Sequence, residues 1–294
     1  MTLGLLLLAT SLVTAAPGAD NPVYNEVTRA GVKVGGKEPV RVPLPTMADG
    51  LDAKAQEKLI AEIAGKGAVP RFIRNSAVAP HVVKMRDLEG DEGDGRVVSV
   101  WFVAYGEVDQ FFDKRFREHM LSAGDDPEMA GQGDALDAAQ LKARNIPWKD
   151  ADNDVKAYSH GSLSLLKKVK VSATIRTFSS RTNDSVIFAA MIDPRFADDA
   201  KFPNNWAPIT RTDTGGVEIG KPRPYGGLGT YLKATRLEAP AGAILVECHT
   251  VFAEPKEWFG GANYLGAKIP AIVQSRVRDV RRELNVTGKP SSKK

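Results

Sequence analysis

The chain has 294 residues, of which 43% are hydrophobic and 26% are charged, the balance of a globular protein with a sizeable core. That composition excludes a chain that is disordered over most of its length, and the single cysteine, Cys248, excludes an internal disulfide and a thiolate-rich metal site. The net charge is +4, and its excess is local, because residues 268–294 hold eight Lys and Arg against two acids.

The first residues, MTLGLLLLATSLVTAA, form a short apolar run followed by small residues. This pattern is typical of an export signal, so we predict that residues 1–19 are removed and that the mature protein is exported, to the periplasm or as a secreted protein. Cleavage could follow Ala16 or Ala19. The alternative is a short membrane anchor, but the apolar stretch is shorter than the roughly 20 residues that a spanning helix needs.

Residues 20–48 contain several prolines and glycines, which interrupt helices and central strands, and they predict an extended lead-in. We assign residues 49–285 to a single domain and residues 286–294 to a disordered basic tail. The domain begins with a predicted helix over residues 51–64, where apolar side chains recur every three or four positions and Gly65 follows at the end.

A first hairpin is predicted by two strand-like runs, residues 81–88 and 96–105, joined by the acidic segment EGDEGDG. The acids of this segment could attract calcium, but the loop pattern of an EF-hand is missing, so we expect a solvent-exposed turn. Residues 107–121 place their aromatic side chains on one stripe, which predicts a helix with a buried face. The polar residues 122–160 predict a surface excursion.

Strand periodicity then returns. Residues 166–178 alternate between apolar and polar side chains, and residues 184–193 follow as their apolar hairpin partner. A further hairpin is predicted from residues 229–237 and 243–252. A long helix over residues 263–284 closes the chain, and Pro270 either marks its true start or bends it.

This order of elements predicts an α+β fold in which a curved antiparallel sheet packs on a long C-terminal helix. It resembles the helix-grip architecture of the START and Bet v 1-like superfamily over roughly residues 51–285, on element order and on the last strand, the EPKEWF turn and the terminal helix. The resemblance implies an apolar cavity between the sheet and the terminal helix. It transfers no functional residues, because no residue motif carries it.

The segment AILVECHTVF holds the most suggestive side chains. In a strand, Cys248 shares a face with apolar residues, which favours core packing and an inert thiol. Glu247 and His249 share the opposite face, which we expect to be the solvent side. With a basic partner from another strand they could form a catalytic group, and by residue type Arg176 is a candidate for that partner, as are Lys233 and Arg236.

The remaining histidines, His81, His119 and His160, are scattered and match no zinc motif. The segment SHGSLS places serines beside His160 but lacks the nucleophile elbow of hydrolases. We therefore predict no metal site and no cofactor.

The leading hypothesis is an exported, non-enzymatic protein that encloses a small apolar or lipid-like ligand between its sheet and its terminal helix. One alternative is an enzyme that uses Glu247 and His249 with a basic partner such as Arg176. Another is an interaction protein whose basic end, residues 268–294, meets an acidic surface. We expect no nucleic-acid partner, since the arginines of that end lack aromatic stacking residues. The sequence leaves the oligomeric state open.

Overall fold

The computed structural model describes residues 18, 20–113, 116, 131–148, 156–211, 216–260 and 262–287. Residues 1–17 and 19 of the predicted export signal and residues 288–294 of the predicted tail lie outside the described residues. Residues 286 and 287, also assigned to that tail, instead end the C-terminal helix.

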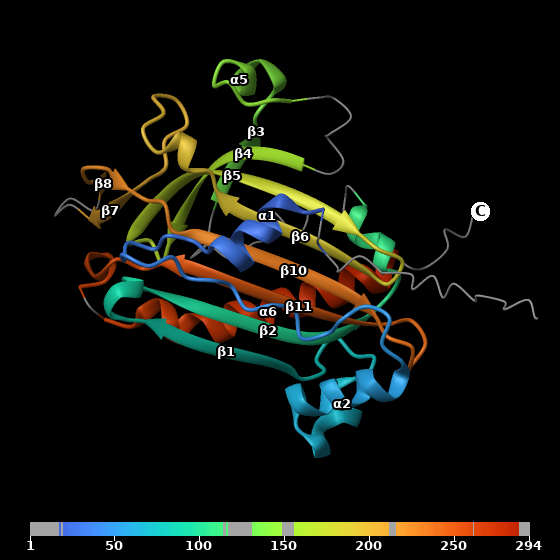
Figure 1. Ribbon diagram of the computed structural model, residues 1–294. Helices are drawn as coiled ribbons and strands as arrows, with labels where there is room; N and C mark the ends of the chain where they lie inside the picture. The colour runs from blue at the N-terminus through green and yellow to red at the C-terminus, as the bar shows by residue number, and fades with distance from the viewer. Residues whose placement is uncertain are drawn as a thin grey trace, which may run out of the picture.

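The centre of the molecule is a large antiparallel sheet with the strand order β1-β2-β11-β10-β6-β5-β4-β3, and β7 joins it beside β5 (Figure 1). The strands are β1 (His81–Leu88), β2 (Gly95–Tyr105), β3 (Gly131–Ala135), β4 (Lys156–Leu165), β5 (Val169–Arg181), β6 (Ser185–Ile192), β7 (Asn205–Arg211), β8 (Val217–Ile219), β9 (Arg223–Pro224), β10 (Leu228–Arg236) and β11 (Ala243–Ala253).

All three predicted hairpins are confirmed: β1 pairs with β2, β5 with β6, and β10 with β11. The acids around the first turn are paired with basic side chains, as in the bond from Arg86 to Glu92 and the bond from Arg96 to Asp87. The surface excursion predicted over residues 122–160 is wrong in two places. Residues 131–135 form strand β3, which pairs with β4, and residues 156–160 begin strand β4, which pairs with β5. Small residues such as Gly161 and Ser162 weaken the apolar periodicity there.

The helices are α1 (Pro22–Asn25), α2 (Ala53–Ala64), α3 (Val69–Phe72), α5 (Ala138–Lys142) and α6 (Tyr264–Thr287). A π-helical turn, η1 (Glu26–Ala30), follows α1, and the 3₁₀ turns are η2 (Lys66–Ala68), η3 (Gly90–Glu92), η4 (Val108–Phe112), η6 (Pro194–Phe196) and η7 (Lys256–Trp258). The predicted helices over residues 51–64 and 263–284 are confirmed as α2 and α6.

The aromatic helix predicted over residues 107–121 is wrong at its start. It is the 3₁₀ turn η4, and Asp113 then adopts an extended backbone with ψ 131°. A capping box between Glu107 and Gln110 closes the turn locally. Phe111 and Phe116 still bury their rings against each other, with centroids 4.9 Å apart, while most of residues 114–121 lie outside the described part.

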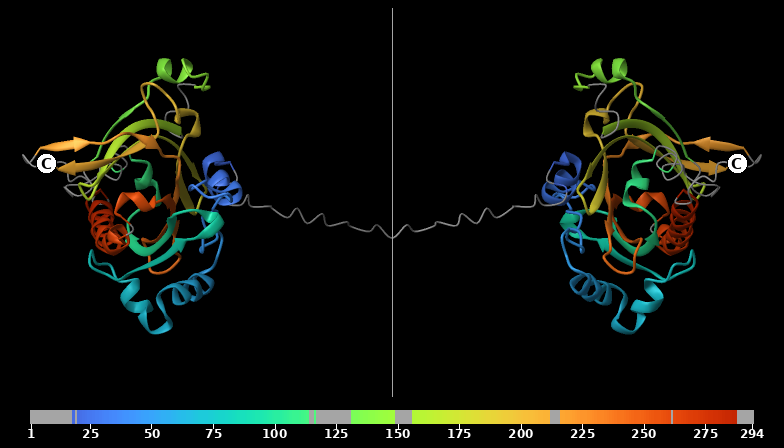
Figure 2. Two further views of the ribbon diagram at one scale, coloured as in Figure 1. Left: turned by 90° about the vertical axis from the view of Figure 1, so that its left-hand side faces the viewer. Right: turned by 90° about the vertical axis from the view of Figure 1, so that its right-hand side faces the viewer.

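The sheet has two differently covered faces. Helix α6 packs across β1 and β2 on one of them, here called the helix face. The opposite, outer face carries the N-terminal segment, including α1 and η1, together with α2 and α3. Figure 2 shows the sheet curving around α6, with the blue N-terminal segment on the other side. The molecule thus has the predicted α+β, helix-grip-like fold, and the lead-in is folded onto the sheet.

Candidate functional site

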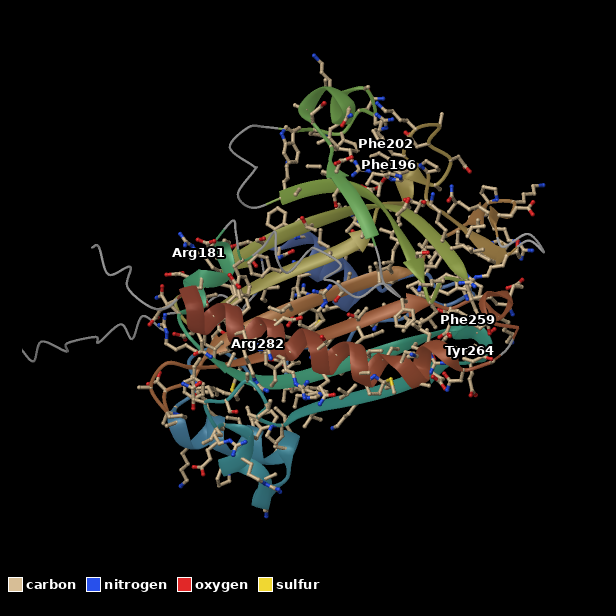
Figure 3. All side chains as sticks on the ribbon, turned by 180° about the vertical axis from the view of Figure 1, so that it is seen from behind. Arg181, Phe196, Phe202, Phe259, Tyr264 and Arg282 are labelled. Carbon is tan, nitrogen blue, oxygen red and sulfur yellow. The ribbon has the colours of Figure 1, made fainter. Side chains whose placement is uncertain are left out.

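The helix face is partly open where α6 does not cover it. Within β10, Leu228, Thr230 and Leu232 point to the helix face and are partly exposed, whereas Tyr231 and Lys233 on the outer face are fully buried. In Figure 3, which views the molecule from the side of α6, the helix lies over β1 and β2, with Phe259 and Tyr264 labelled near its start. Within the described residues, the central strands beyond α6 are covered on this face at one end, where η4 contacts β6 and β10.

The neighbouring strands continue the pattern. The cross-strand pairs Leu232 with Cys248 and Leu232 with Phe188 place these side chains side by side on the helix face. We call the partly exposed, mainly apolar side chains of this face the apolar strip; they are Ile175, Phe188, Ala190, Leu228, Leu232, Cys248 and Phe252. At one end the Phe112 ring of η4 lies 5.2 Å from the Phe188 ring. A contiguous group of exposed apolar side chains is a candidate binding surface.

Two hydroxyls interrupt the apolar strip. Thr230 donates to the backbone carbonyl of His249 at 3.0 Å, and its Oγ1 lies 2.7 Å from Oγ1 of Thr250. Because the single Thr230 hydrogen is used by the carbonyl, Thr250 donates to Thr230 and keeps its own lone pairs for another donor. Burial raises the pKa of the Cys248 thiol beside them, against the two threonine hydroxyls that lower it. The raised pKa favours the neutral thiol, and the residue is partly exposed on the helix face rather than buried in the core.

The outer face holds the polar side chains that the sequence singled out, under residues 43–50, which we call the strap. Glu247 is fully buried, and its two carboxylate oxygens accept hydrogen bonds from the backbone N–H groups of Thr46 at 2.7 Å and Met47 at 3.1 Å. Lys233, opposite Glu247 in the register, is also fully buried. Its Nζ donates to the Met47 carbonyl at 2.6 Å.

Lys233 also forms an ion pair with Asp49 of the strap, with Nζ 2.8 Å from Oδ1. Asp49 accepts further hydrogen bonds from Thr182 at 2.6 Å and from Ser185 at 2.9 Å. Burial alone would raise the pKa of Asp49, but the bonds from Lys233, Thr182 and Ser185 outweigh it and hold this pKa below its ordinary value. The strap is thus fixed by charge-assisted hydrogen bonds.

His249 lies beside this group. Its Nδ1 is 2.8 Å from the Ser99 hydroxyl, and its Nε2 is 3.6 Å from Oε2 of Glu247. The Trp101 and Tyr231 rings each lie 5.1 Å from the imidazole. Tyr231 donates its hydroxyl to the Pro43 carbonyl at 2.7 Å, and burial, with Glu247 as a lesser cause, raises the Tyr231 pKa.

Glu247 and His249 therefore share a face, but the expectation that this face meets solvent is wrong, because the strap covers it. Arg176 is not brought to them: it pairs with Glu26 of η1. Lys233 is the basic residue that the fold places opposite Glu247. These hydrogen bonds attach the strap to the sheet. The side chains of Glu247, His249 and Lys233 are buried beneath it.

The strap was missed because prolines and glycines predicted only an irregular lead-in. A signal does stand in the segment that leads into the strap, where Val32, Val34, Val40 and Val42 are all buried. An alternating pattern is that of a segment with one face against the protein. Read together with the polar outer face of β11, it would have predicted a covering segment there.

The other histidines do not join this group. His160 lies on β4, where its Nδ1 is 3.0 Å from the Thr174 hydroxyl, and His119 lies outside the described residues. Among the residues that the structure describes, no three His, Cys, Asp or Glu side chains are grouped to hold a metal ion. None of the described helices has the length and apolarity to cross a membrane.

No family model matches the chain, and the search of curated proteins returns no match either. Solved structures do match. A human StarD13 (DLC2) lipid transfer and protein localization domain is 8% identical, with a TM-score of 0.42, 70% of this chain covered and 86% of that one. A protein from Arthrobacter aurescens is 11% identical, with a TM-score of 0.32 and coverages of 66% and 87%. The Mll3558 protein from Rhizobium loti is 9% identical, with a TM-score of 0.31 and coverages of 69% and 99%. These likenesses concern the architecture and say nothing about what this chain binds.

Proposed function

We propose that the protein binds a small apolar or lipid-like molecule on the apolar strip, between the sheet and α6. The observation that carries this proposal is the reversal of burial along β10, where Leu232 is partly exposed and the adjacent Lys233 is fully buried. The sheet buries the lysine completely on its outer face and leaves the leucine partly exposed on its helix face. The helix face therefore has apolar surface that a ligand can cover. Covering that surface with an apolar ligand contributes about 25 cal/mol for each Å² removed from water.

The chemistry of the apolar strip suits a ligand with one weakly polar end. Most of its side chains are aliphatic or aromatic, and Thr250 keeps acceptor capacity for one ligand hydroxyl. No charged side chain belongs to the strip. A neutral molecule such as a sterol, fatty alcohol or other lipid-like compound therefore fits the site better than a charged metabolite.

We also propose that the protein is exported, with residues 1–19 as the signal. In support of this, the chain is folded onto the sheet from the end of that segment onward. Asn21 caps α1 and donates its side-chain amide to the Phe178 carbonyl at 3.0 Å. A mature chain that starts at residue 17 or residue 20 keeps this anchor. The mass of the mature protein, recorded by native mass spectrometry, tests the cleavage site and would also reveal a co-purified ligand.

The binding proposal is tested with N-phenyl-1-naphthylamine, a neutral apolar fluorophore, after organic extraction of the purified protein. We expect saturable binding by the wild type and about tenfold weaker binding by Leu232→Glu, since apolar contact would desolvate the new carboxylate. Leu232 is partly exposed, so the variant keeps a solvated charge and should fold.

The matched control is Val217→Glu, which adds the same charge on β8 at a position that is 68% exposed. It should bind the fluorophore like the wild type. Equal affinity for all three proteins, or no binding by an extracted protein whose circular dichroism is native, would overturn the proposal.

A further inference from the structure

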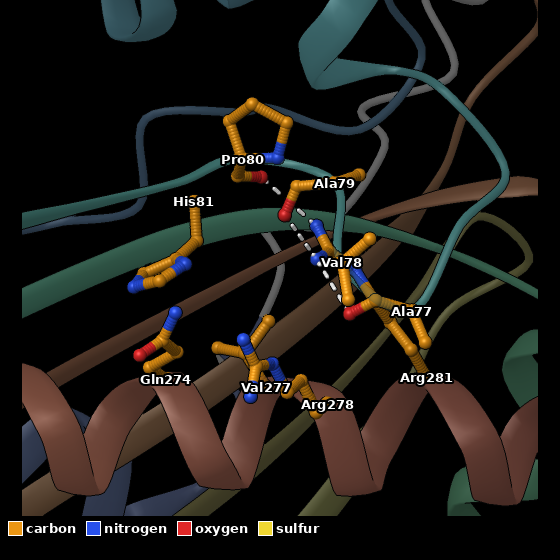
Figure 4. A pocket seen from close by; sticks show the side chains of 9 residues that line it. All are labelled: Ala77, Val78, Ala79, Pro80, His81, Gln274, Val277, Arg278 and Arg281. Carbon is orange, nitrogen blue, oxygen red and sulfur yellow. Dashed lines mark hydrogen bonds between the residues drawn. The ribbon is translucent and has the colours of Figure 1, made fainter.

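A pocket lies between the segment that enters β1 and the C-terminal half of α6 (Figure 4). Its volume is about 190 Å³, below the roughly 300 Å³ at which drug-sized ligand sites begin. Residues 77–81 form one wall, and Gln274, Val277, Arg278 and Arg281 of α6 form the other. The pocket is separate from the apolar strip, because it involves β1, at the edge of the sheet.

All the titratable side chains that line this pocket are basic. Arg281 is 2% exposed, and its guanidinium donates to the carbonyls of Val103 at 2.8 Å, Ala79 at 2.6 Å and Pro80 at 3.0 Å. A longer bond of 3.5 Å reaches the Ala77 carbonyl. All these partners are neutral, and among the described residues no carboxylate forms an ion pair with Arg281. A buried guanidinium without a counter-charge is costly and is a ready partner for an anion.

Two further basic groups face the same space. Arg278, one turn before Arg281 on α6, is partly exposed, and His81 on β1 lies opposite them. None of the nine lining residues is acidic, and the wall of residues 77–80 adds no charge. The pocket therefore joins two permanent cations with a third group that becomes cationic when protonated.

The titration of these groups agrees with a positive potential. Burial lowers the pKa of Arg281 to about 10. Burial also lowers the pKa of His81, and the charges of Arg281 and Arg278 lower it further. The burial shift of Arg281 reflects the loss of water around its charge, whereas the effect of Arg278 and Arg281 on His81 reflects the positive potential that these two guanidinium groups create in the pocket.

We propose that the pocket formed by residues 77–81 and the Gln274–Arg281 face of α6 is a binding site for a phosphate group. A dianionic phosphate neutralises both guanidinium groups, whereas a single carboxylate leaves one of them without a counter-charge. Four hydrogen bonds occupy four of the five N–H groups of Arg281 and leave one for the anion. The phosphate could belong to a free phosphate ester or to a lipid headgroup, which share this chemistry.

The first experiment uses inorganic phosphate as the probe, at constant ionic strength maintained with chloride, and follows the His81 ring by NMR. We expect phosphate to raise the pKa of His81, because the bound anion opposes the charges of Arg278 and Arg281. A His81 pKa that stays unchanged up to saturating phosphate would overturn the proposal.

The second experiment measures phosphate affinity by calorimetry in two variants of the same helix. Arg278→Ala removes a partly exposed member of the pocket and should weaken binding by about tenfold or more, the loss expected for a charge-assisted hydrogen bond. Arg282→Ala removes an exposed neighbour that lies outside the pocket and 4.0 Å from Asp279, and it should leave the affinity unchanged. Equal weakening in both variants would show general attraction by a basic helix and would contradict a site.

Vesicles distinguish the two sources of the phosphate. Binding to phosphatidic acid vesicles but not to phosphatidylcholine vesicles, lost in Arg278→Ala and kept in Arg282→Ala, would assign the pocket to a lipid headgroup. Phosphate binding without vesicle binding would assign it to a soluble ester. Failure of both probes would overturn the phosphate site while leaving ligand binding on the apolar strip unaffected, since the naphthylamine assay reports that site separately.

Discussion

The two faces of the sheet differ in a way that hydropathy does not predict. On the outer face, Lys233, Glu247 and His249 are sealed beneath the strap and held by backbone groups and by Asp49. On the helix face, one residue away, Leu232 and Cys248 are partly exposed. The polar side chains of the outer face are thus already covered by another segment of the same chain. The helix face still has apolar surface to cover, and this is where we place the ligand.

The contrast is sharpest at the ion pair of Lys233 with Asp49. Changing Lys233 to Met should lower the free energy of unfolding by about 3–5 kcal/mol, because it leaves a partly buried carboxylate without its counter-charge. Chemical denaturation measures this loss. In the double variant Lys233→Met with Asp49→Asn, part of the stability should return. If the loss of unfolding free energy in the double variant equals the sum of the losses in the two single variants, Lys233 and Asp49 do not form the described ion pair.

Truncating one leucine on each face allows the packing of the two faces to be compared directly. Leu245→Ala empties a fully buried outer-face position and should cost about 2–5 kcal/mol. Leu232→Ala on the helix face should cost less than half as much in the extracted protein, because its side chain is already partly hydrated. The same denaturation experiment measures both. Equal costs would mean that the apolar strip is packed by protein and is no ligand surface.

The smallest expected effect is the pH dependence of the strap. Since the pKa of Asp49 is lowered in the folded chain, its contribution is fully present above its ordinary value, near pH 4, and is lost as the pH falls through the folded pKa. The urea midpoint should therefore fall below pH 4 less steeply in Asp49→Asn than in the wild type. Asp193, whose pKa is also lowered, remains in both proteins. If the urea midpoints of the two proteins fall in parallel with pH, Asp49 does not contribute to the loss of stability in acid.

Local patterns were sufficient to predict the hairpins and α6, because each has its own period and turn residues. Gly90 and Gly93, for example, take positive φ values in the turn between β1 and β2. The strap could not be recognised in this way. Several of its hydrogen bonds come from backbone N–H and carbonyl groups, which carry no sequence signal. The partners of these groups lie almost 200 positions away, as with Thr46 and Glu247 at a separation of 201 and Met47 and Lys233 at a separation of 186.

The proposed ligand surface is less accessible to sequence reasoning than the fold. The sequence placed an apolar ligand between sheet and terminal helix through a resemblance of element order, without naming a residue. The partly exposed members of the apolar strip, such as Phe188 and Leu232, look like ordinary core residues in a sequence. Their exposure depends on which strands α6 covers, and it contacts β1 and β2. Arg281 likewise counted as one more charge of a basic end, although the fold buries it.

The position of the strap also has a consequence for how the chain folds. Met47 can meet Lys233 only after a further 186 residues have been made, so its native partners are missing throughout most of synthesis. Contacts that are this distant in sequence slow folding, because a long loop must close before they stabilise anything. We expect the N-terminal segment to dock late, after β10 and β11 have supplied the side chains to which it is bonded.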